Sequence, residues 1–186
     1  MRKMALLATC IVAGLASAAQ AEEKGFKLSV PGMKEGATLP DAQVFSGFGC
    51  KGGNKSPALS WTDPPAKAKG LAITAYDPDA PTGSGWWHWM VVNLPASLRK
   101  LPEGAGDASG SQLPSGALQA RTDFGATGYG GACPPPGNPP HRYIFTVWAL
   151  DVDKLPLDAN ASGAMVGFFL NQHAVGKASF TLKYGR

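Results

Sequence analysis

The sequence predicts a mainly β protein in which two antiparallel sheets pack together, with one or two peripheral helices. Several short runs rich in β-branched and aromatic residues are separated by turn signals, and only one segment has a helical period. Apolar residues make up 44% of the 186 residues, which is enough for one packed core. Glycine (24 residues) and proline (16 residues) are abundant, so much of the chain is expected to form fixed turns and loops.

Five segments have the composition or the alternation of strands. They span residues 27–30, 71–76, 86–93, 142–150 and 178–184. In a strand, residues two apart share a face. Strict alternation therefore divides the third segment into two faces, one with Trp86, His88, Met90 and Val92 and the other with Trp87, Trp89 and Val91.

The helical period lies between about residues 160 and 174. Apolar side chains recur there with a spacing near 3.6 residues, namely at Met165, Phe168, Phe169 and Leu170. Asn160 and Ser162 are available as N-caps.

Residues 101–140 form a different region, with nine glycines, seven prolines and almost no strand pattern. A loop of this length inside a compact domain is usually functional or disordered. Cys133 and the stiff Pro134-Pro135-Pro136 run favour an ordered, functional loop.

The first 21 residues have the layout of a cleaved secretory signal peptide. A basic start at Arg2 and Lys3 is followed by a short apolar run and by the small-residue site Ala19-Gln20-Ala21. The apolar run is too short for a transmembrane anchor. We therefore expect cleavage near Ala21, a single domain over residues 22–186 without a membrane span, and a periplasmic or secreted location.

Charge and cysteine content agree with an exported protein that does not bind nucleic acid. The leader carries two of the 17 basic residues, so residues 22–186 have 15 basic and 13 acidic side chains, a net charge of +2 with no basic cluster. Cys50 and Cys133 are the two cysteines beyond the leader. In an oxidising compartment this even count favours a disulfide over two buried free thiols.

Asp77 and Asp79 follow a predicted buried strand in the motif Asp77-Pro78-Asp79-Ala80-Pro81. In an extended chain they would share one face, although an ordinary Asp-Pro turn explains the spacing better. His88, between two tryptophans, is by itself more typical of a hydrogen-bonded core histidine than of a pocket group.

His141 and Tyr143 lie two apart at the start of a predicted strand and should point the same way. The preceding glycines, 128, 130 and 131, could present backbone N–H groups as an anion-binding concavity. Imidazole, phenol and backbone donors suit a phosphate or a carboxylate. Arg142 would face the opposite side and is interpreted as a structural ion-pair partner.

Motifs of several enzyme classes are missing from the sequence. It contains no G-x-S-x-G elbow, P-loop, C-x-x-C or H-x-x-x-H pattern. We therefore expect no activated nucleophile, no cofactor and no dedicated metal site, although a metal held by His88, His141 and an aspartate is geometrically conceivable.

Three motifs in this order, DPDAP (77–81), WxHxxVVN (86–93) and PHRY (140–143), resemble those of the phosphatidylethanolamine-binding protein family. The segments FGCKGGNKSPALSW (48–61) and YGGACPPPG (129–137) resemble its bacterial Raf kinase inhibitor-like branch. The resemblance implies a β-sandwich with a small anion pocket at one end. It implies a lining of Asp77, Asp79, Pro81, Trp86, His88, Gly131, Pro134, His141 and Tyr143. It also makes Ala80–Pro81 a candidate cis peptide.

The function expected from these features is that of an exported binding protein for a small anionic group. Phosphate, a phospholipid headgroup, a phosphorylated small molecule or a carboxylate would fit, and regulation of a partner protein is a further role. Two alternatives remain open: a protease or kinase inhibitor that acts through a surface loop, and a hydrolase with a His/Asp general base. Phosphate-type ligands should bind better below about pH 6.5, where histidine gains a proton. A homodimer is compatible with the sequence, but no pattern specifies one.

Overall fold

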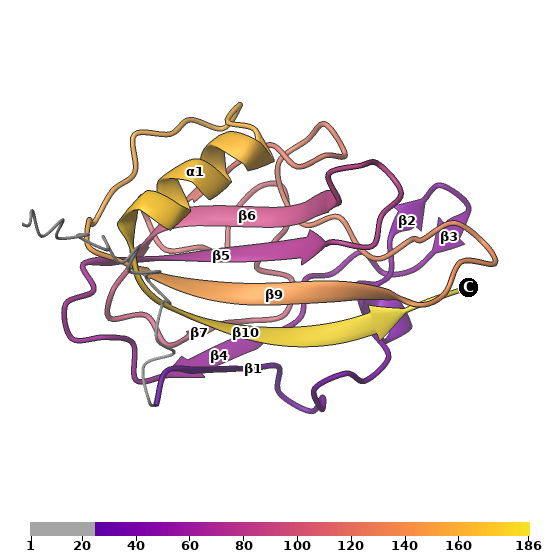
Figure 1. Ribbon diagram of the computed structural model, residues 1–186, viewed down its shortest axis with the longest axis horizontal. Coiled ribbons are helices and arrows are strands. Elements are labelled where there is room, and N and C mark those ends of the chain that lie inside the picture. Colours follow the sequence, from indigo (N-terminus) through magenta and orange to yellow (C-terminus); the bar gives the residue numbers. More distant parts are fainter. Residues whose placement is uncertain (1–24) are drawn as a thin grey trace, which may run out of the picture.

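Ten strands, one α-helix and a short 3-10 helix make up the computed structural model, which describes residues 25–186 (Figure 1). In chain order the elements are β1 (Lys27–Ser29), η1 (Asp41–Gln43), β2 (Ser46–Gly47), β3 (Cys50–Lys51), β4 (Leu59–Thr62), β5 (Gly70–Asp77), β6 (Trp86–Pro95), β7 (Lys100–Leu101), β8 (Leu118–Gln119), β9 (His141–Leu150), α1 (Gly163–His173) and β10 (Ala174–Tyr184). The predicted signal peptide, its cleavage site and the apolar run lie outside the described residues.

The strands form two main antiparallel sheets and one small hairpin. A five-stranded sheet has the order β10-β9-β5-β6-β8, a three-stranded sheet has the order β1-β4-β7, and β2 pairs with β3. The predicted mainly β fold with packed antiparallel sheets is therefore confirmed. The five predicted strands correspond to β1, β5, β6, β9 and β10. The other five strands, β2, β3, β4, β7 and β8, have two to four residues and were not predicted, because such short runs carry little alternation.

The five-stranded sheet is covered on both faces. On one face, buried side chains pack between the two sheets, among them Leu28, Trp61, Leu71, Ile73, Trp89 and Phe145. On the other face a second cluster forms under α1, which lies across the sheet in Figure 1, and includes Ala72, Met90, Val92, Val166 and Leu170. Burial on both sides explains why β5 is a nearly continuous apolar run.

Helix α1 begins at Gly163, and the Ser162 hydroxyl accepts a hydrogen bond from the backbone N–H of Met165 at 3.3 Å, as its proposed role as a cap requires. Val166 and Leu170 face the sheet, but Met165 and Phe168 are 52% and 65% exposed. The predicted helix is therefore present, although two of the apolar residues that indicated it are exposed to solvent. No helix within residues 25–186 is long and apolar enough to cross a membrane.

A β-bulge in β6 changes the predicted faces of this strand. Ala75 of β5 pairs with Trp89 and the next residue, Tyr76, pairs with Trp87, so β6 contains one extra residue at this point. On the N-terminal side of the bulge, Trp86 and His88 line a pocket at one end of the sandwich. Met90 and Val92 pack under α1, where they are joined by Trp87. The prediction that Trp86 and His88 share a face with Met90 and Val92 is therefore wrong.

Several chain segments meet at one end of the sandwich, on the right in Figure 1. There β5 ends at Asp77, β6 begins at Trp86 and β9 begins at His141. The β2–β3 hairpin and the 101–140 segment close over this end. A disulfide between Cys50 and Cys133, with Cα atoms 6.0 Å apart, links the hairpin to that segment and confirms the predicted pairing.

Candidate functional site

A pocket of about 230 Å³ opens where these strand ends meet. Its lining includes seven of the nine predicted ligand-binding residues, namely Asp77, Pro81, Trp86, His88, Pro134, His141 and Tyr143. It also includes Phe48, Ala80, Thr82, Phe124, Cys133 and Pro135. Distant sequence motifs therefore converge on one small cavity whose walls are mainly apolar.

Asp77 and His141 form a buried pair at the base of the pocket. His141 Nδ1 lies 2.8 Å from Asp77 Oδ2, and each side chain is 4% exposed. Asp77 Oδ1 accepts hydrogen bonds from the backbone N–H groups of Asp79 and Ala80. Both carboxylate oxygens are thus used inside the protein, so Asp77 orients the histidine ring and shapes the following turn.

Asp79 does not line this pocket. The turn held by Asp77 aims Asp79 outward, where its Oδ2 accepts from Arg142 Nε at 2.9 Å and its Oδ1 accepts from Arg142 Nη2 at 2.7 Å. This pair lowers the pKa of Asp79 to about 2. The two aspartates therefore do not share a face as an extended chain would place them, and Arg142 has the structural ion-pair role expected of it.

Gly131 lies behind the pocket wall and does not line it. Two backbone N–H groups of the glycine segment are already used within the protein: Gly130 donates to the His88 carbonyl at 2.8 Å, and Gly131 donates to Asn54 Oδ1 at 2.7 Å. Gly130 and Gly131 therefore contribute no free N–H group to the predicted anion-binding concavity. Gly131 instead permits a close backbone approach, because a Cβ there would collide with the backbone of residues 43–45.

His88 is buried and its orientation is fixed. Its Nδ1 donates to the Gly130 carbonyl oxygen at 2.7 Å, so Nδ1 carries the proton and Nε2 is left as the nitrogen without a hydrogen bond in the described chain. Its ring packs edge-on against Phe124 and Tyr143. Burial lowers the pKa of His88, although the nearby Asp77 carboxylate acts in the opposite direction.

Two polar atoms of the pocket lining have no partner. Within residues 25–186, Trp86 Nε1 and the Tyr143 hydroxyl are buried and make no hydrogen bond. A buried donor left unpaired is costly, and such groups are rare in folded proteins. Burial raises the pKa of Tyr143 well above its usual range, although the nearby backbone N–H of Cys133 acts in the opposite direction. That N–H can only donate to the phenol oxygen, so the hydroxyl stays protonated and its own hydrogen has no acceptor. Both residues belong to the pocket wall, so this wall holds two donors that no acceptor of the described chain satisfies.

The peptide bond before Pro81 differs from expectation. No peptide bond in the described residues is cis, so Ala80–Pro81 is trans. Pro81 still lines the pocket, and the turn is shaped by the Asp77 side chain.

Sequence reasoning missed Phe48 and Phe124, which form an aromatic wall of the pocket. Both lie in loops without periodicity. One signal was available for Phe48. It lies two residues before Cys50, and the predicted disulfide partner Cys133 directly precedes Pro134, which was a predicted lining residue. The disulfide therefore places Phe48 near the pocket. No group of three or more metal-ligating side chains occurs in the part of the chain that the structure describes.

Comparison with known proteins identifies relatives over nearly the whole described chain. The profile of the family described as "Phosphatidylethanolamine-binding protein" matches residues 29–185. UPF0098 protein YbcL of Escherichia coli (strain K12) is 50% identical over 179 residues, which are 96% of this chain and 97% of YbcL. UPF0098 protein YbhB of the same strain is 54% identical over 158 residues, which are 85% of this chain and 99% of YbhB.

The fold is also similar to a solved structure. The crystal structure of E. coli YbcL, described as a new member of the mammalian PEBP family, superposes with a TM-score of 0.86 and 52% identity, and the match covers 87% of this chain and 99% of that one. A more distant relative in Mycobacterium tuberculosis (strain ATCC 25618 / H37Rv), provisionally named lipoprotein LppC, is 34% identical over 151 residues, which are 81% of this chain and 68% of LppC.

Proposed function

Because the chain belongs to the phosphatidylethanolamine-binding protein family, we propose that it is an exported binding protein whose pocket holds a phosphate-type or other small anionic group. The group could be a phospholipid headgroup, a phosphorylated small molecule or a carboxylate, since all present oxygen acceptors. The proposal includes no catalytic turnover and no cofactor.

The observation that carries the proposal is the pair of unpartnered donors, Trp86 Nε1–H and Tyr143 O–H. An indole N–H can only donate, so any ligand that satisfies it must bring an acceptor. Protonation of His88 would add a positive charge and a third donor at Nε2. A phosphate-type head offers several acceptor oxygens within a few ångströms and so can serve all three groups at once.

Export is supported by the signal-peptide layout of residues 1–21 and by the Cys50–Cys133 disulfide, because disulfides persist in oxidising compartments. The name of the LppC relative describes a lipoprotein, a class of protein found outside the cytoplasm. We propose a periplasmic or secreted location on these grounds.

Titration calorimetry with inorganic phosphate and O-phosphorylethanolamine tests the binding function. The unmodified protein should bind at least one of them, and Tyr143→Phe, which removes the donor but keeps the ring, should weaken binding roughly tenfold. Tyr184→Phe is the matched control, because Tyr184 does not line the pocket and should leave affinity unchanged. No binding of either ligand, or equal affinity in Tyr143→Phe, would refute the proposal.

The absence of turnover is tested separately. The Asp77–His141 pair has the arrangement of a general base, but the hydroxyls that line the pocket belong to Thr82 and Tyr143, and neither is hydrogen-bonded to a histidine. We expect no release of nitrophenol from nitrophenyl phosphate or nitrophenyl acetate above the buffer rate. Release that is lost in His141→Ala would replace the binding function with hydrolysis.

A further inference from the structure

Phe48 occupies an unfavourable position for its side chain. Gly47 pairs with Cys50 across the β2–β3 hairpin, so Phe48 and Gly49 form its two-residue loop. Their φ angles are +51° and +82°. Hairpin loops with two positive φ values strongly prefer Asn-Gly or Asp-Gly, because a large side chain is disfavoured at the first position. Phe48 is nevertheless present there, and it is 68% exposed.

The exposed Phe48 ring packs against Phe124, and both rings belong to the pocket wall. The two rings are nearly parallel, with an interplanar angle of 18° and centroids 6.0 Å apart. Phe45 packs against both of them from behind. Phe124 in turn contacts Trp86 and His88 edge-on, with centroids 5.4 and 5.3 Å apart. We call Phe48 and Phe124 the aromatic shelf.

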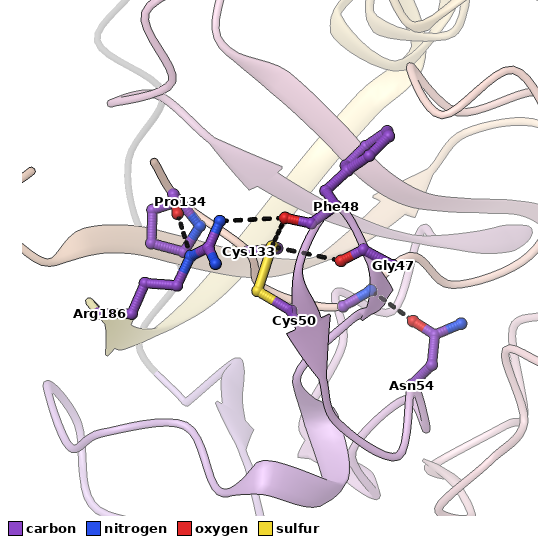
Figure 2. Close-up of a disulfide and its surroundings, with 8 residues drawn as sticks. Gly47, Phe48, Cys50, Asn54, Cys133, Pro134 and Arg186 are labelled. Atoms are coloured by element: carbon purple, nitrogen blue, oxygen red, sulfur yellow. Dashed lines mark hydrogen bonds between the residues drawn. A yellow bond between two sulfur atoms is a disulfide. The ribbon is translucent and has the colours of Figure 1, made fainter. Parts of the chain in front are cut away.

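The aromatic shelf is held in place by covalent and polar contacts. Cys50, two residues after Phe48, is bonded to Cys133, which lines the pocket itself. Arg186 bridges the two sides of the mouth, because its Nη2 donates to the Phe48 carbonyl at 3.1 Å and its Nε donates to the Pro134 carbonyl at 2.7 Å. Figure 2 shows these contacts, with the Phe48 ring pointing away from the disulfide. A large exposed ring in a disfavoured and well-anchored turn indicates a role beyond folding.

We propose that the aromatic shelf selects anions that carry a flat aryl group next to the anionic head, such as aryl phosphomonoesters. This inference rests on the binding function proposed above. The head would accept hydrogen bonds from Trp86 and Tyr143, and the ring would lie on Phe48 and Phe124 at the mouth.

The chemistry of the pocket supports both parts of such a ligand. Beyond the donors, the histidines, Asp77 and Thr82, the walls are apolar and include Pro81, Pro134 and Pro135 beside the aromatic rings. A bare anion would leave this apolar surface exposed to water, whereas an aryl ester would cover it. Flat rings also gain from offset-stacked and edge-on contacts that saturated groups of the same size cannot make.

Three phosphate esters separate the aryl preference from general hydrophobicity: methyl, cyclohexyl and phenyl phosphate, measured by calorimetry at one pH and ionic strength. We expect phenyl phosphate to bind roughly tenfold or more tighter than methyl phosphate, because the ring buries additional apolar area. We expect it to bind about threefold tighter than cyclohexyl phosphate, which has the same carbon count but is not flat.

Variants of Phe48 test whether this residue causes the preference for phenyl phosphate. Phe48→Asn, which suits the hairpin loop, should lower the methyl-to-phenyl ratio of dissociation constants to about threefold or less, with an unchanged or higher melting temperature. Phe48→Tyr should retain most of the ratio. Phe168→Ala is the control, because Phe168 is 65% exposed on α1 and does not line the pocket.

The outcomes are distinguishable. If methyl and phenyl phosphate both bind but with equal affinity, or if Phe48→Asn keeps the full ratio, the aryl inference is overturned and the anion-binding function stands. If cyclohexyl phosphate equals phenyl phosphate, the shelf is merely apolar and the inference is also overturned. If none of the esters binds to the unmodified protein, both proposals fail.

Discussion

His141 Nδ1 lies 2.8 Å from Asp77 Oδ2, although 64 positions separate the two residues in sequence. Asp77 ends β5 and His141 begins β9, so this contact joins two adjacent strand ends. The other oxygen of Asp77 holds the backbone N–H groups of Asp79 and Ala80. A single buried carboxylate therefore fixes both a histidine of the pocket and the turn that forms part of its wall.

Replacing this carboxylate should destabilise the whole domain. In Asp77→Ala, the His141 Nδ1–H and two backbone N–H groups lose their acceptor in a buried environment. We expect the free energy of unfolding to fall by about 3 kcal/mol. Urea denaturation at neutral pH measures this change.

The chain contains a matched control for that variant. His173 and Asp151 form a similar pair at 2.9 Å, but the Asp151 side chain is 53% exposed. Asp151→Ala should therefore lower stability by less than about 1 kcal/mol. Equal losses of unfolding free energy in the two variants would show that burial does not increase the contribution of the Asp77–His141 pair to stability.

Asp79 should make stability depend on pH in the acid range. Arg142 lowers the pKa of Asp79 from 3.8 to about 2 in the folded state, so the contribution is complete above pH 4 and is lost as the pH falls from about 4 towards 2. Since the Arg142 side chain is 51% exposed, we expect only about 1 kcal/mol.

Asp79→Asn provides the test, because the neutral amide imitates the protonated acid. Denaturation of both proteins between pH 6 and pH 2.5 should show a gap in unfolding free energy that narrows as the pH falls. A gap that stays constant over this range would exclude the ion pair as its origin.

Sulfate binding should become tighter in acid because of His88. Burial lowers the pKa of His88, so the imidazole is neutral at pH 7 and gains a proton only below its usual range near 6.5. A bound anion favours the protonated form, and affinity must therefore rise as the pH falls. Sulfate does not titrate between pH 8 and 4.5, so calorimetry over this range reports on the protein alone.

Two histidine variants identify the source of this pH dependence. His88→Ala should flatten the profile, whereas His173→Ala should keep it, because His173 pairs with Asp151 away from the pocket. A flat profile in the unmodified protein would contradict the role of His88. Because burial lowers the pKa of His88, the affinity for sulfate should rise at a lower pH than the value of about 6.5 expected for an ordinary histidine.

The disulfide should contribute substantially to stability. Cys50 and Cys133 are 83 residues apart, and closing a loop of that size is worth about 4 kcal/mol in the chain-entropy account. Cys50→Ser combined with Cys133→Ser should show this loss in urea denaturation. A reducing agent should destabilise the unmodified protein and leave the double variant unchanged. A loss below about 1 kcal/mol would mean that the unfolded chain is already constrained.

The fold was predictable from the sequence where burial imposes a pattern. β5 and β9 are long apolar runs, and the alternation of β10 is regular, so their identity as strands follows from composition. The bulge in β6 was not predictable, because one extra residue leaves the composition unchanged while it reverses the faces beyond it.

From the residue pattern alone the site was predictable only near strand ends, whereas loop residues such as Pro134 were predicted from the motifs that resemble those of the family. His141 and Tyr143 point into the pocket because they alternate along β9 from its first residue. Asp79 could not be placed, because its backbone N–H donates to the Asp77 carboxylate and this contact turns the chain away from extended geometry. Phe48 and Phe124 belong to loops that meet only in three dimensions, so no local pattern marks them.

A crystal structure of the protein grown with phosphate tests the central claim most directly. We predict phosphate oxygens within hydrogen-bond distance, about 3 Å, of both Trp86 Nε1 and the Tyr143 hydroxyl. A pocket that stays free of phosphate at saturating concentration, or a phosphate bound elsewhere while these two donors remain unpartnered, would contradict the account.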